Sequence, residues 1–468
     1  MPSRREQIQS YQYLMQRVVN AFMVGDTDPA QPPLRRLAGA GFASIMVTAL
    51  VVAAVGVFGL IRHGGNSSWQ DEHVVVIEKE TGTRYVYRAG TLYPVANYVS
   101  ALLVIGGAAP TVSVSRESLV GAARGPLIGI AGAPDALPPA SRLLGAPWSV
   151  CAQPGADSET ALTWLVAGRD PGPGSALGDR GVLALDTSGR GVYLLWNGHR
   201  YLTANRTVLT GMGVDQQPRV PVDPAWLNAI PAGETLASVS VDSRGKASTA
   251  VPGALVGQVL ALGSGDSAQY YLVRAADLQP LTPLQEALTL ADTATAAAYP
   301  GATPAPVPVT AAQLAGVKVA GQPEHTDASP PDRVPAMVQV PQSQTVCAEY
   351  RDATSPPSIV VGVPSVAANA GIATNGPNSG SAALVDRVLV PAGYAAVVAA
   401  APAPDSAVTQ LYLVTDQGRR YPVPNPAELG WLGYANATPL VLPASLVARI
   451  PAGPALDPLA AAQPVPAG

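Results

Sequence analysis

The sequence predicts an α+β protein in which one N-terminal membrane-spanning helix precedes a large exported part with a central β-sheet core and four small repeat domains in a pseudo-two-fold arrangement. Three observations predict this fold: an uncharged apolar run, a strand motif that occurs four times, and two cysteines placed symmetrically among those copies. Of the 468 residues, 48% are hydrophobic and 13% charged, and Gly 46 with Pro 47 indicate short strands and tight turns. The net charge of −4 lacks the basic excess of a nucleic-acid binder.

The first 36 residues are a polar leader. Its apolar side chains recur at three- and four-residue steps, which predicts an amphipathic helix that ends near Gly25. These side chains are Ile8, Tyr11, Met15, Val18, Val19 and Phe22. Such a helix docks either on a partner protein or on a membrane surface, and the sequence leaves both alternatives open.

The apolar run extends from Leu37 to Ile61 without a charge and is bounded by arginines. As a helix it is roughly 37 Å long, enough to cross a bilayer of about 30 Å. A buried core helix and a cleaved signal are the alternatives, but a signal has a shorter apolar run and begins near the first residue. Arginines precede the run and Asp71 and Glu72 follow it, so the positive-inside rule predicts a cytosolic N-terminus.

Cys151 and Cys347 both lie on the exported side, and their flanks are alike, since each stands between a valine and an alanine. An even pair of cysteines in an oxidising compartment predicts a disulfide. A bond between them would close a loop of 196 residues. In the chain-entropy model, closing such a loop stabilises the fold by roughly 5 kcal/mol. A metal site is the weaker alternative, because the chain has no CxxC motif and its histidines are scattered. The histidines stand at positions 63, 73, 199 and 325.

A two-strand motif occurs four times. An aromatic-aliphatic strand is followed by a second strand around an aromatic or X-Pro dipeptide, and the spacings from the first tyrosine to the proline position are 9, 9, 9 and 10. The copies are Tyr85-Val86-Tyr87 with Leu92-Tyr93-Pro94-Val95, Tyr193-Leu194-Leu195 with Arg200-Tyr201-Leu202, Tyr271-Leu272-Val273 with Leu278-Gln279-Pro280-Leu281, and Tyr412-Leu413-Val414 with Arg420-Tyr421-Pro422-Val423. Each copy continues into a short helix that carries a leucine, namely Leu102, Leu209, Leu288 or Leu429.

A second signature follows each copy: an aliphatic residue and, four or five positions later, a leucine, which predicts a second short helical turn. The pairs are Val114 with Leu119, Val222 with Leu227, Val309 with Leu314, and Leu442 with Leu446. Ser115, Asp223 and Thr310 stand at the predicted N-caps. Such a unit is too small to bury a core alone and needs a neighbour.

The order repeat, cysteine, repeat occurs twice and predicts two similar halves joined by the disulfide. We expect aliphatic runs between the repeats to form a shared central sheet. These runs are Leu162 to Val166, Val182 to Leu185, Val256 to Leu262, Ile359 to Val363 and Val388 to Val390.

The predicted domains follow from these features. They are 1–36, a cytosolic amphipathic helix and linker; 37–61, the membrane span; 74–132, repeat 1; 133–190, the first core segment; 191–264, repeat 2; 265–320, repeat 3; 321–404, the second core segment; 405–451, repeat 4; and 452–468, a Pro/Ala-rich tail. The composition of the tail favours a free segment over an extended contact segment.

These residues together resemble the EccB family of the actinobacterial type VII (ESX) secretion system. The resemblance is specific in the leader RREQIQSYQYLMQRVVNAFMVGD, the strand segment RYVYRAGTLYPVANYVSALLV and the two V-C-A segments. It implies an elongated periplasmic part with a central β-sheet core, four repeat domains and one disulfide. It also implies a structural subunit of a hexameric inner-membrane complex with the EccC ATPase, EccD and EccE, in contact with the MycP protease.

Members of this family are often labelled ATPases, but the sequence contains no G-x-x-x-x-G-K-[ST] motif, and we predict no catalytic, cofactor or metal residues. The nearest string, Ser243 to Ser248, lacks the first glycine and is predicted to be a turn. Gly265-Asp266-Ser267 resembles a segment of a protease signature and is predicted to be a loop before the strand at Tyr270.

A scaffold is therefore the expected function, and the ATPase remains one rival. A cell-wall-binding protein is the other rival. It would expose Tyr93, Tyr201 and Tyr421 to hold glycan, whereas a scaffold would bury them.

Overall fold

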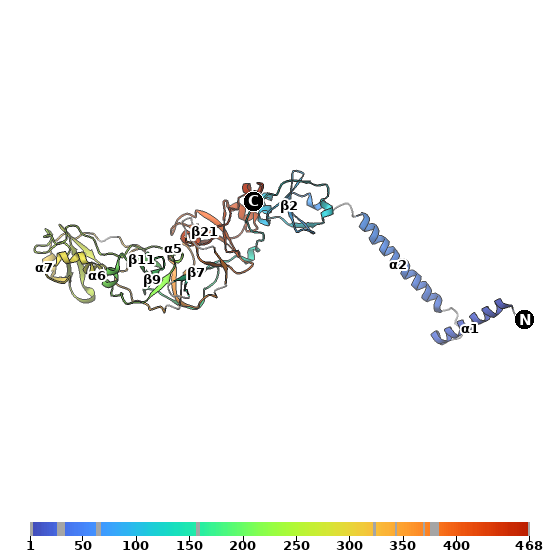
Figure 1. Cartoon of the computed structure of the whole chain (residues 1–468), viewed down its shortest axis with the longest axis horizontal. Coiled ribbons are helices and arrows are strands. Elements are labelled where there is room, and N and C mark those ends of the chain that lie inside the picture. The colour runs from blue at the N-terminus through green and yellow to red at the C-terminus, as the bar shows by residue number, and fades with distance from the viewer. Residues whose placement is uncertain are drawn as a thin grey trace.

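The computed structural model describes residues 3–25, 33–61, 67–155, 160–321, 324–341, 344–367, 370–374 and 383–466. Figure 1 shows an elongated molecule with the two N-terminal helices at one end and a row of small β-domains behind them. It is an α+β protein, as predicted, with one long apolar helix and several separate sheets.

The N-terminal helices agree with the prediction. Helix α1 (Arg4–Val24) ends at Gly25, whose φ of 72° lies in the left-handed region that glycine adopts at low cost. Helix α2 (Pro33–Ile61) contains the apolar run, and no residue of its stretch Ala38–Phe58 is buried.

The four repeats share one topology: three antiparallel strands, a short helix, a fourth strand parallel to the first, and a final helical turn. Repeat 1 contains β1 (Val75–Glu78), β2 (Arg84–Arg88), β3 (Thr91–Pro94), α3 (Tyr98–Ile105), β4 (Thr111–Val114), η2 (Arg116–Leu119) and β5 (Ala123–Arg124). Repeat 2 contains β9 (Val182–Asp186), β10 (Val192–Trp196), β11 (His199–Leu202), α4 (Arg206–Gly211), β12 (Arg219–Val222) and α5 (Pro224–Ala229). Repeat 3 contains β13 (Val259–Leu262), β14 (Gln269–Val273), β15 (Leu278–Leu281), α6 (Pro283–Ala291), η5 (Thr293–Ala298), β16 (Val307–Val309) and α7 (Ala311–Leu314). Repeat 4 contains β21 (Ala395–Ala401), β22 (Gln410–Thr415), β23 (Arg420–Val423), α8 (Pro426–Trp431), β24 (Leu440–Pro443) and α9 (Ala444–Val447).

The predicted repeat elements are confirmed. The tyrosine motifs form the hairpins, and the four leucines lie buried on the short helices. The side chains of Asp223 and Thr310 accept N–H bonds at the starts of α5 and α7, while Ser115 contacts the Ser118 hydroxyl instead.

The central sheet contains seven strands in the order β19-β20-β7-β6-β17-β18-β8. They are β6 (Trp148–Pro154), β7 (Ala161–Val166), β8 (Ser175–Ala176), β17 (Thr345–Tyr350), β18 (Ser358–Val363), β19 (Ile372–Ala373) and β20 (Arg387–Leu389). The equivalent strands β6 and β17 pair antiparallel at the middle, with β7 and β18 outside them. This pairing gives the two halves their pseudo-two-fold relation.

Two strand predictions were wrong. Val182 to Leu185 and Val256 to Leu262 were expected in the central sheet, but β9 and β13 are instead the first strands of repeats 2 and 3. Their partners are the tyrosine strands β10 and β14, so each repeat builds its own sheet. The domain limits stay a proposal, which we revise to 75–124, 182–229, 259–314 and 395–447 for the four repeats.

The repeats pack in pairs on either side of the core. From left to right, Figure 1 shows repeat 3, repeat 2, the central sheet, repeat 4 and repeat 1, followed by α2. Leu209 of repeat 2 and Leu288 of repeat 3 belong to one buried cluster, and Leu102 of repeat 1 shares another with Leu429 of repeat 4. The predicted helix leucines therefore form the contacts between repeats.

The C-terminal tail was expected to be free, and this was wrong for its described residues. Leu456 and Ala461 are completely buried, and helix α10 (Pro458–Ala461) packs against α3. Val465 N–H donates to Leu127 O, and Gly129 N–H donates to Gln463 O. The tail thus connects repeat 4 to repeat 1, because burial of its few apolar side chains outweighs its unstructured composition.

Candidate functional site

The disulfide lies at the centre of the molecule. Cys151 on β6 and Cys347 on β17 are directly opposite each other, with an S–S distance of 2.07 Å. Both cysteines are fully buried beside Trp164 and Val363. The bond therefore joins the two halves of the chain at their pseudo-two-fold axis.

Hydrogen bonds hold repeat 2 on the core and join it to repeat 4. Trp226 of α5 donates its indole N–H to Val150 O at 3.0 Å. The Ala229 carbonyl accepts from the Tyr350 hydroxyl at 2.8 Å and from the Ser445 hydroxyl at 3.1 Å. One carbonyl of repeat 2 thus contacts both the central sheet and repeat 4.

A partly buried carboxyl group lies at the same junction. Asp223 caps α5 through the Ala225 N–H. Burial raises the pKa of Asp223, and the negative charges of Asp386 and Asp186 raise it further. The fold therefore places a carboxyl group where its ionised form is disfavoured.

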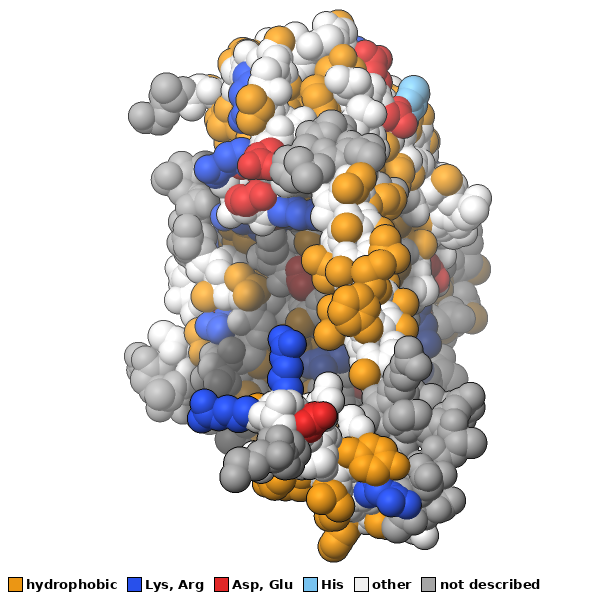
Figure 2. Space-filling model, turned by 90° about the vertical axis from the view of Figure 1, so that its right-hand side faces the viewer, with side chains coloured by type: hydrophobic (Ala, Val, Ile, Leu, Met, Phe, Trp, Pro, Cys, Tyr) orange, Lys and Arg blue, Asp and Glu red, His pale blue; other side chains and the backbone are white. Residues whose placement is uncertain are grey.

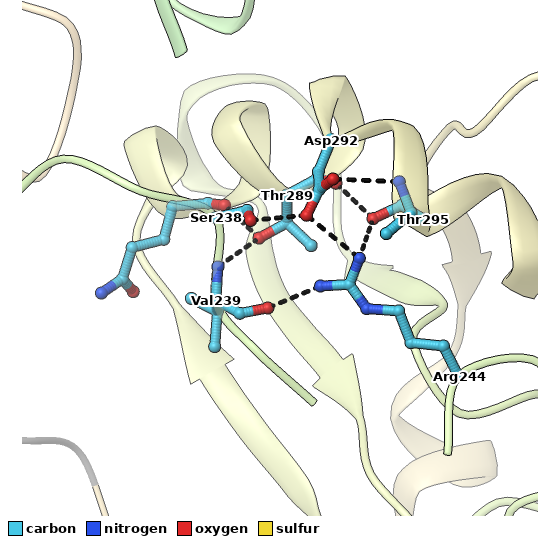
Figure 3. Close-up of polar contacts among 8 residues, drawn as sticks. Ser238, Val239, Arg244, Thr289, Asp292 and Thr295 are labelled. Atoms are coloured by element: carbon cyan, nitrogen blue, oxygen red, sulfur yellow. Dashed lines mark hydrogen bonds and ion pairs between the residues drawn. The ribbon is translucent and has the colours of Figure 1, made fainter. Parts of the chain in front are cut away.

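A polar network ties the segment after repeat 2 to repeat 3 (Figure 3). The Arg244 guanidinium contacts Asp292 at 3.2 Å and donates to Thr295 at 3.0 Å and to Val239 O at 2.8 Å. Ser238 donates to the same carboxylate at 2.6 Å. Burial alone would raise the pKa of Asp292. The hydrogen bonds from Ser238, the Ala294 N–H and Arg244 outweigh burial and hold this pKa below its usual value. The network makes the connection between repeats 2 and 3 a specific one.

The two sequence strings with a resemblance to catalytic motifs have structural positions. The turn from Ser243 to Ser248 contains Arg244, whose side chain is only 11% exposed and engaged in the network above. Gly265–Ser267 is a short 3₁₀ turn before β14, as expected. Neither string forms a phosphate-binding loop at the start of a helix.

The described histidines lie far apart in the fold. His73 is exposed beside Asp71, His199 is buried in repeat 2, and position 63 lies outside the described residues. Across the stretches of chain that the structure describes, no group of three or more His, Cys, Asp or Glu side chains is placed to hold a metal ion.

The repeat tyrosines pack inward. Tyr201 and Tyr421 are completely buried, and Tyr93 is half-buried. The glycan-binding alternative needs these three rings on the surface to hold a sugar, and their burial argues against it. Burial raises the pKa of Tyr201 to about 12, and its hydroxyl donates to Ser329 O at 3.0 Å.

The exposed apolar surface is concentrated on the N-terminal helices. Figure 2 looks at the molecule from the end that carries them and shows a column of hydrophobic side chains with basic side chains beside its lower end. The stretch Ala38–Phe58 has a mean hydropathy of 2.3, long and apolar enough for a membrane span. On α1, the predicted apolar stripe is exposed as well, from Ile8 to Phe22.

Comparison with known families decides the identity. A family described as "Type VII secretion system ESX-1, transport TM domain B" matches residues 1–465. The chain belongs to the EccB family. This match confirms the resemblance seen in the sequence and covers the leader, the apolar helix, all repeats and the tail.

Relatives of this EccB-family chain come from several mycobacterial secretion systems. The "ESX-3 secretion system ATPase EccB3" of Mycolicibacterium smegmatis is 27% identical over 97% of this chain and 89% of that protein. The protein of the same name from Mycobacterium tuberculosis is 30% identical over 304 residues, which cover 61% of this chain and only 55% of that relative.

Solved structures show the same architecture. A chain of an intact ESX-5 inner membrane complex aligns with a TM-score of 0.62 and 25% identity over 100% of this chain and 96% of that one. A chain of an EccB3 dimer from the ESX-3 core complex aligns with a TM-score of 0.61 at 24% identity, and this second likeness concerns the fold alone.

Proposed function

We propose that this EccB-family chain is a structural subunit of a type VII secretion complex, anchored in the inner membrane and organising the periplasmic side of the export channel. The observation that carries the proposal is the alignment of the whole chain with a subunit of the intact ESX-5 inner membrane complex. Its architecture supports the same role, since paired repeats, a central disulfide and a docked tail make an elongated body suited to positioning other subunits.

In this proposal α2 crosses the membrane with α1 in the cytosol and the repeats in the periplasm. The arginines before the apolar run and the acids after it support this orientation. The disulfide supports it too, because disulfides persist in oxidising compartments. The proposed partners are EccC, EccD, EccE and the MycP protease, with several copies of this chain in a hexameric assembly.

Extraction of the full-length chain in mild detergent, with a tag after Gly468, tests this function. We expect a large assembly that contains an ATPase motor and a multi-span subunit. Recovery of the chain alone, or with cell-wall fragments in place of membrane subunits, would overturn the proposal.

The ATPase is the second candidate, because the relatives carry that word in their names. The structure offers it little support, since the string nearest to a phosphate loop is a turn that holds Arg244 in the network of Figure 3. ATP hydrolysis by the purified chain, lost on Lys246→Ala and retained by Lys318→Ala, would favour it. We expect no hydrolysis above the level of a buffer control.

A further inference from the structure

Each repeat carries its fourth strand at the outer edge of its sheet. These strands are β4, β12, β16 and β24, and each pairs with the first strand of its repeat. In β4, the Val114 carbonyl accepts a hydrogen bond from the Lys79 N–H at 2.9 Å, on the side of β1. Because alternate residues of a parallel strand direct their backbone groups to opposite sides, the residues between direct theirs away from the sheet. These outward residues are Thr111, Ser113 and Ser115.

Proline blunts this outer edge in the other three repeats. Pro221 of β12 and Pro308 of β16 stand two residues before the N-cap of the final helical turn, where β4 has Ser113. In repeat 4, Pro439 and Pro443 stand at the remaining two outward positions. Proline has no N–H to donate, and its presence on an edge strand hinders pairing with another chain. The strand β4 contains no proline, so its edge keeps its outward N–H groups.

The edge of β4 is exposed and its outward groups are unpaired. Thr111 and Ser113 are both exposed. Trp69 of η1 (Ser67–Trp69) contacts the buried side of the strand, where it shares a cluster with Val114. Within the stretches of chain that the structure describes, the outward N–H and C=O groups of the two exposed residues form no hydrogen bond. They are therefore available to a further strand.

Such an edge is complementary to itself. When two copies of β4 meet antiparallel with Ser113 opposite Ser113, the Ser113 N–H of each copy reaches the Ser113 carbonyl of the other. The Ser115 N–H of each copy reaches the Thr111 carbonyl of the other in the same way. The same patch on both copies thus supplies donors and acceptors, as an isologous two-fold interface requires.

The charges beside the edge are compatible with this pairing. Arg116 and Glu117 follow the strand, and the Arg116 guanidinium contacts Glu78 of its own copy at 2.9 Å. In the antiparallel register these two residues lie opposite the uncharged residues Ala109 and Pro110 of the other copy. Like charges directly opposite each other would oppose the pairing, and none meet here.

Anchoring in one membrane brings these edges together. Repeat 1 follows α2 after residues 62–66, a connection of at most about 20 Å, so every copy carries β4 at a similar height above the membrane. We propose that β4 pairs antiparallel with β4 of a second copy of this chain, which joins two repeat-1 sheets into one continuous sheet between neighbouring subunits. This inference rests on the proposed function, in which several copies assemble in one membrane.

Thiol crosslinking of the full-length chain in isolated membranes tests the pairing. Because Cys151 and Cys347 are joined in the buried disulfide, Ser113→Cys introduces the thiol that reacts. A bis-maleimide with a two-carbon linker is added to membranes that contain two differently tagged copies. We expect a dimer that carries both tags, at about ten times the yield from Glu117→Cys. Glu117 is the matched control, because it is exposed in the same repeat but lies far from the proposed two-fold axis.

A second set of variants separates the backbone from the side chain. Thr111→Cys in one tagged copy and Ser115→Cys in the other lie opposite each other in the proposed register, and they report on it while Ser113 is varied. Ser113→Pro in both copies removes the outward N–H, and the yield of this crosslink should fall by about tenfold. Ser113→Ala keeps that N–H and should leave the yield within about twofold. Pro221 and Pro308 at the equivalent positions indicate that the repeat fold accepts proline here.

Several results would overturn the pairing of β4 with itself. They are the absence of the two-tag dimer from Ser113→Cys, an equal yield from Glu117→Cys, an equal loss with alanine and proline at Ser113, or a crosslink to a different protein in place of the second copy. Recovery of the large membrane assembly without the crosslink would reject this inference and leave the proposed function standing. A crosslinked dimer from a chain that purifies without other membrane subunits would uphold the pairing and count against the proposed function.

Discussion

The ring of Tyr421 occupies the space that a side chain on Gly453 would need, since a Cβ on Gly453 would lie 2.3 Å from Tyr421 Cε1. The same relationship joins Tyr93 with Gly125 and Tyr201 with Gly233. In the sequence each glycine follows its tyrosine by 32 residues, from 93 to 125, 201 to 233 and 421 to 453. This tyrosine-glycine pair is a signature of repeats 1, 2 and 4. It joins the third strand of each repeat to the segment that follows its last helical turn.

Alanine at Gly233 or Gly453 should destabilise the protein. The added Cβ meets a completely buried ring, and overpacking of this kind costs about 1–3 kcal/mol of unfolding free energy. Denaturant unfolding followed by tryptophan fluorescence measures it. Gly107→Ala is the matched control, because a Cβ at Gly107 meets nothing within 4 Å. An equal loss of unfolding free energy in the control would mean that the close approach of ring and glycine does not cause the destabilisation.

Removal of the disulfide should lower stability without changing the fold. Cys151 and Cys347 lie among apolar neighbours, so alanine at both positions leaves no buried polar group, and the loss expected from the long closed loop is about 2–5 kcal/mol. The denaturation midpoint of the wild-type chain should fall when a reductant is present during unfolding. The midpoint of the double variant should not respond to reductant, and a response would show that the assay senses something other than this bond.

The sequence predicted those elements of the fold that have local signals. The tyrosine hairpins, the helix leucines and the caps at Asp223 and Thr310 depend on residues within about ten positions, where strand and helix preferences act directly. The apolar helix was predicted for the same reason, since a long run without charge has few alternatives.

The sheet assignments of β9 and β13 and the docking of the tail depend on distant partners instead. A short run such as Val182 to Leu185 satisfies a central strand and a repeat strand equally well, so only pairing with β10 decides between them. In β21, five alanines flank Val397 and Val398 and give no strand signal, although the strand is completely buried. The tyrosine-glycine spacing of 32 was present in the sequence. It would have predicted that the segment after the last helical turn packs against the third strand of its repeat.

Asp223→Asn should stabilise the protein at neutral pH. Because burial raises the pKa of Asp223, the folded state holds its proton more tightly than the unfolded state. Its contribution to stability is therefore fully present below the ordinary carboxyl pKa and is lost as the pH rises through the raised folded value. Asparagine stays neutral and still caps α5.

Thermal unfolding of both proteins between pH 4 and pH 8 measures the effect. The gain in melting temperature from Asp223→Asn should grow with pH and vanish at the acidic end. Asp242→Asn, at an exposed position, is the control and should show no such trend. A gain that is constant across the range would contradict the assigned titration.

The network around Arg244 should behave as one unit. Arg244→Gln and Asp292→Asn each leave a partly buried polar partner without its ion pair, so each should cost about 1–3 kcal/mol. The double variant should cost less than the sum of the two, because the pair is lost only once. A double-mutant cycle from denaturant unfolding measures the coupling, and strict additivity would mean that Arg244 acts through Thr295 and Val239 alone.

Two leucines of the tail provide a matched test of its docking. Leu456 is completely buried between repeats 1 and 4, whereas Leu459, three residues later on α10, is 76% exposed. Leu456→Ala removes buried methyl groups and should cost about 2–5 kcal/mol, while Leu459→Ala should stay within about 0.5 kcal/mol of the wild type. Hydrogen exchange adds a local readout, because loosening of the tail should raise exchange at Val465, whose N–H donates to Leu127 O, before it affects repeat 3. Equal effects of the two substitutions would show that the tail is not held by Leu456.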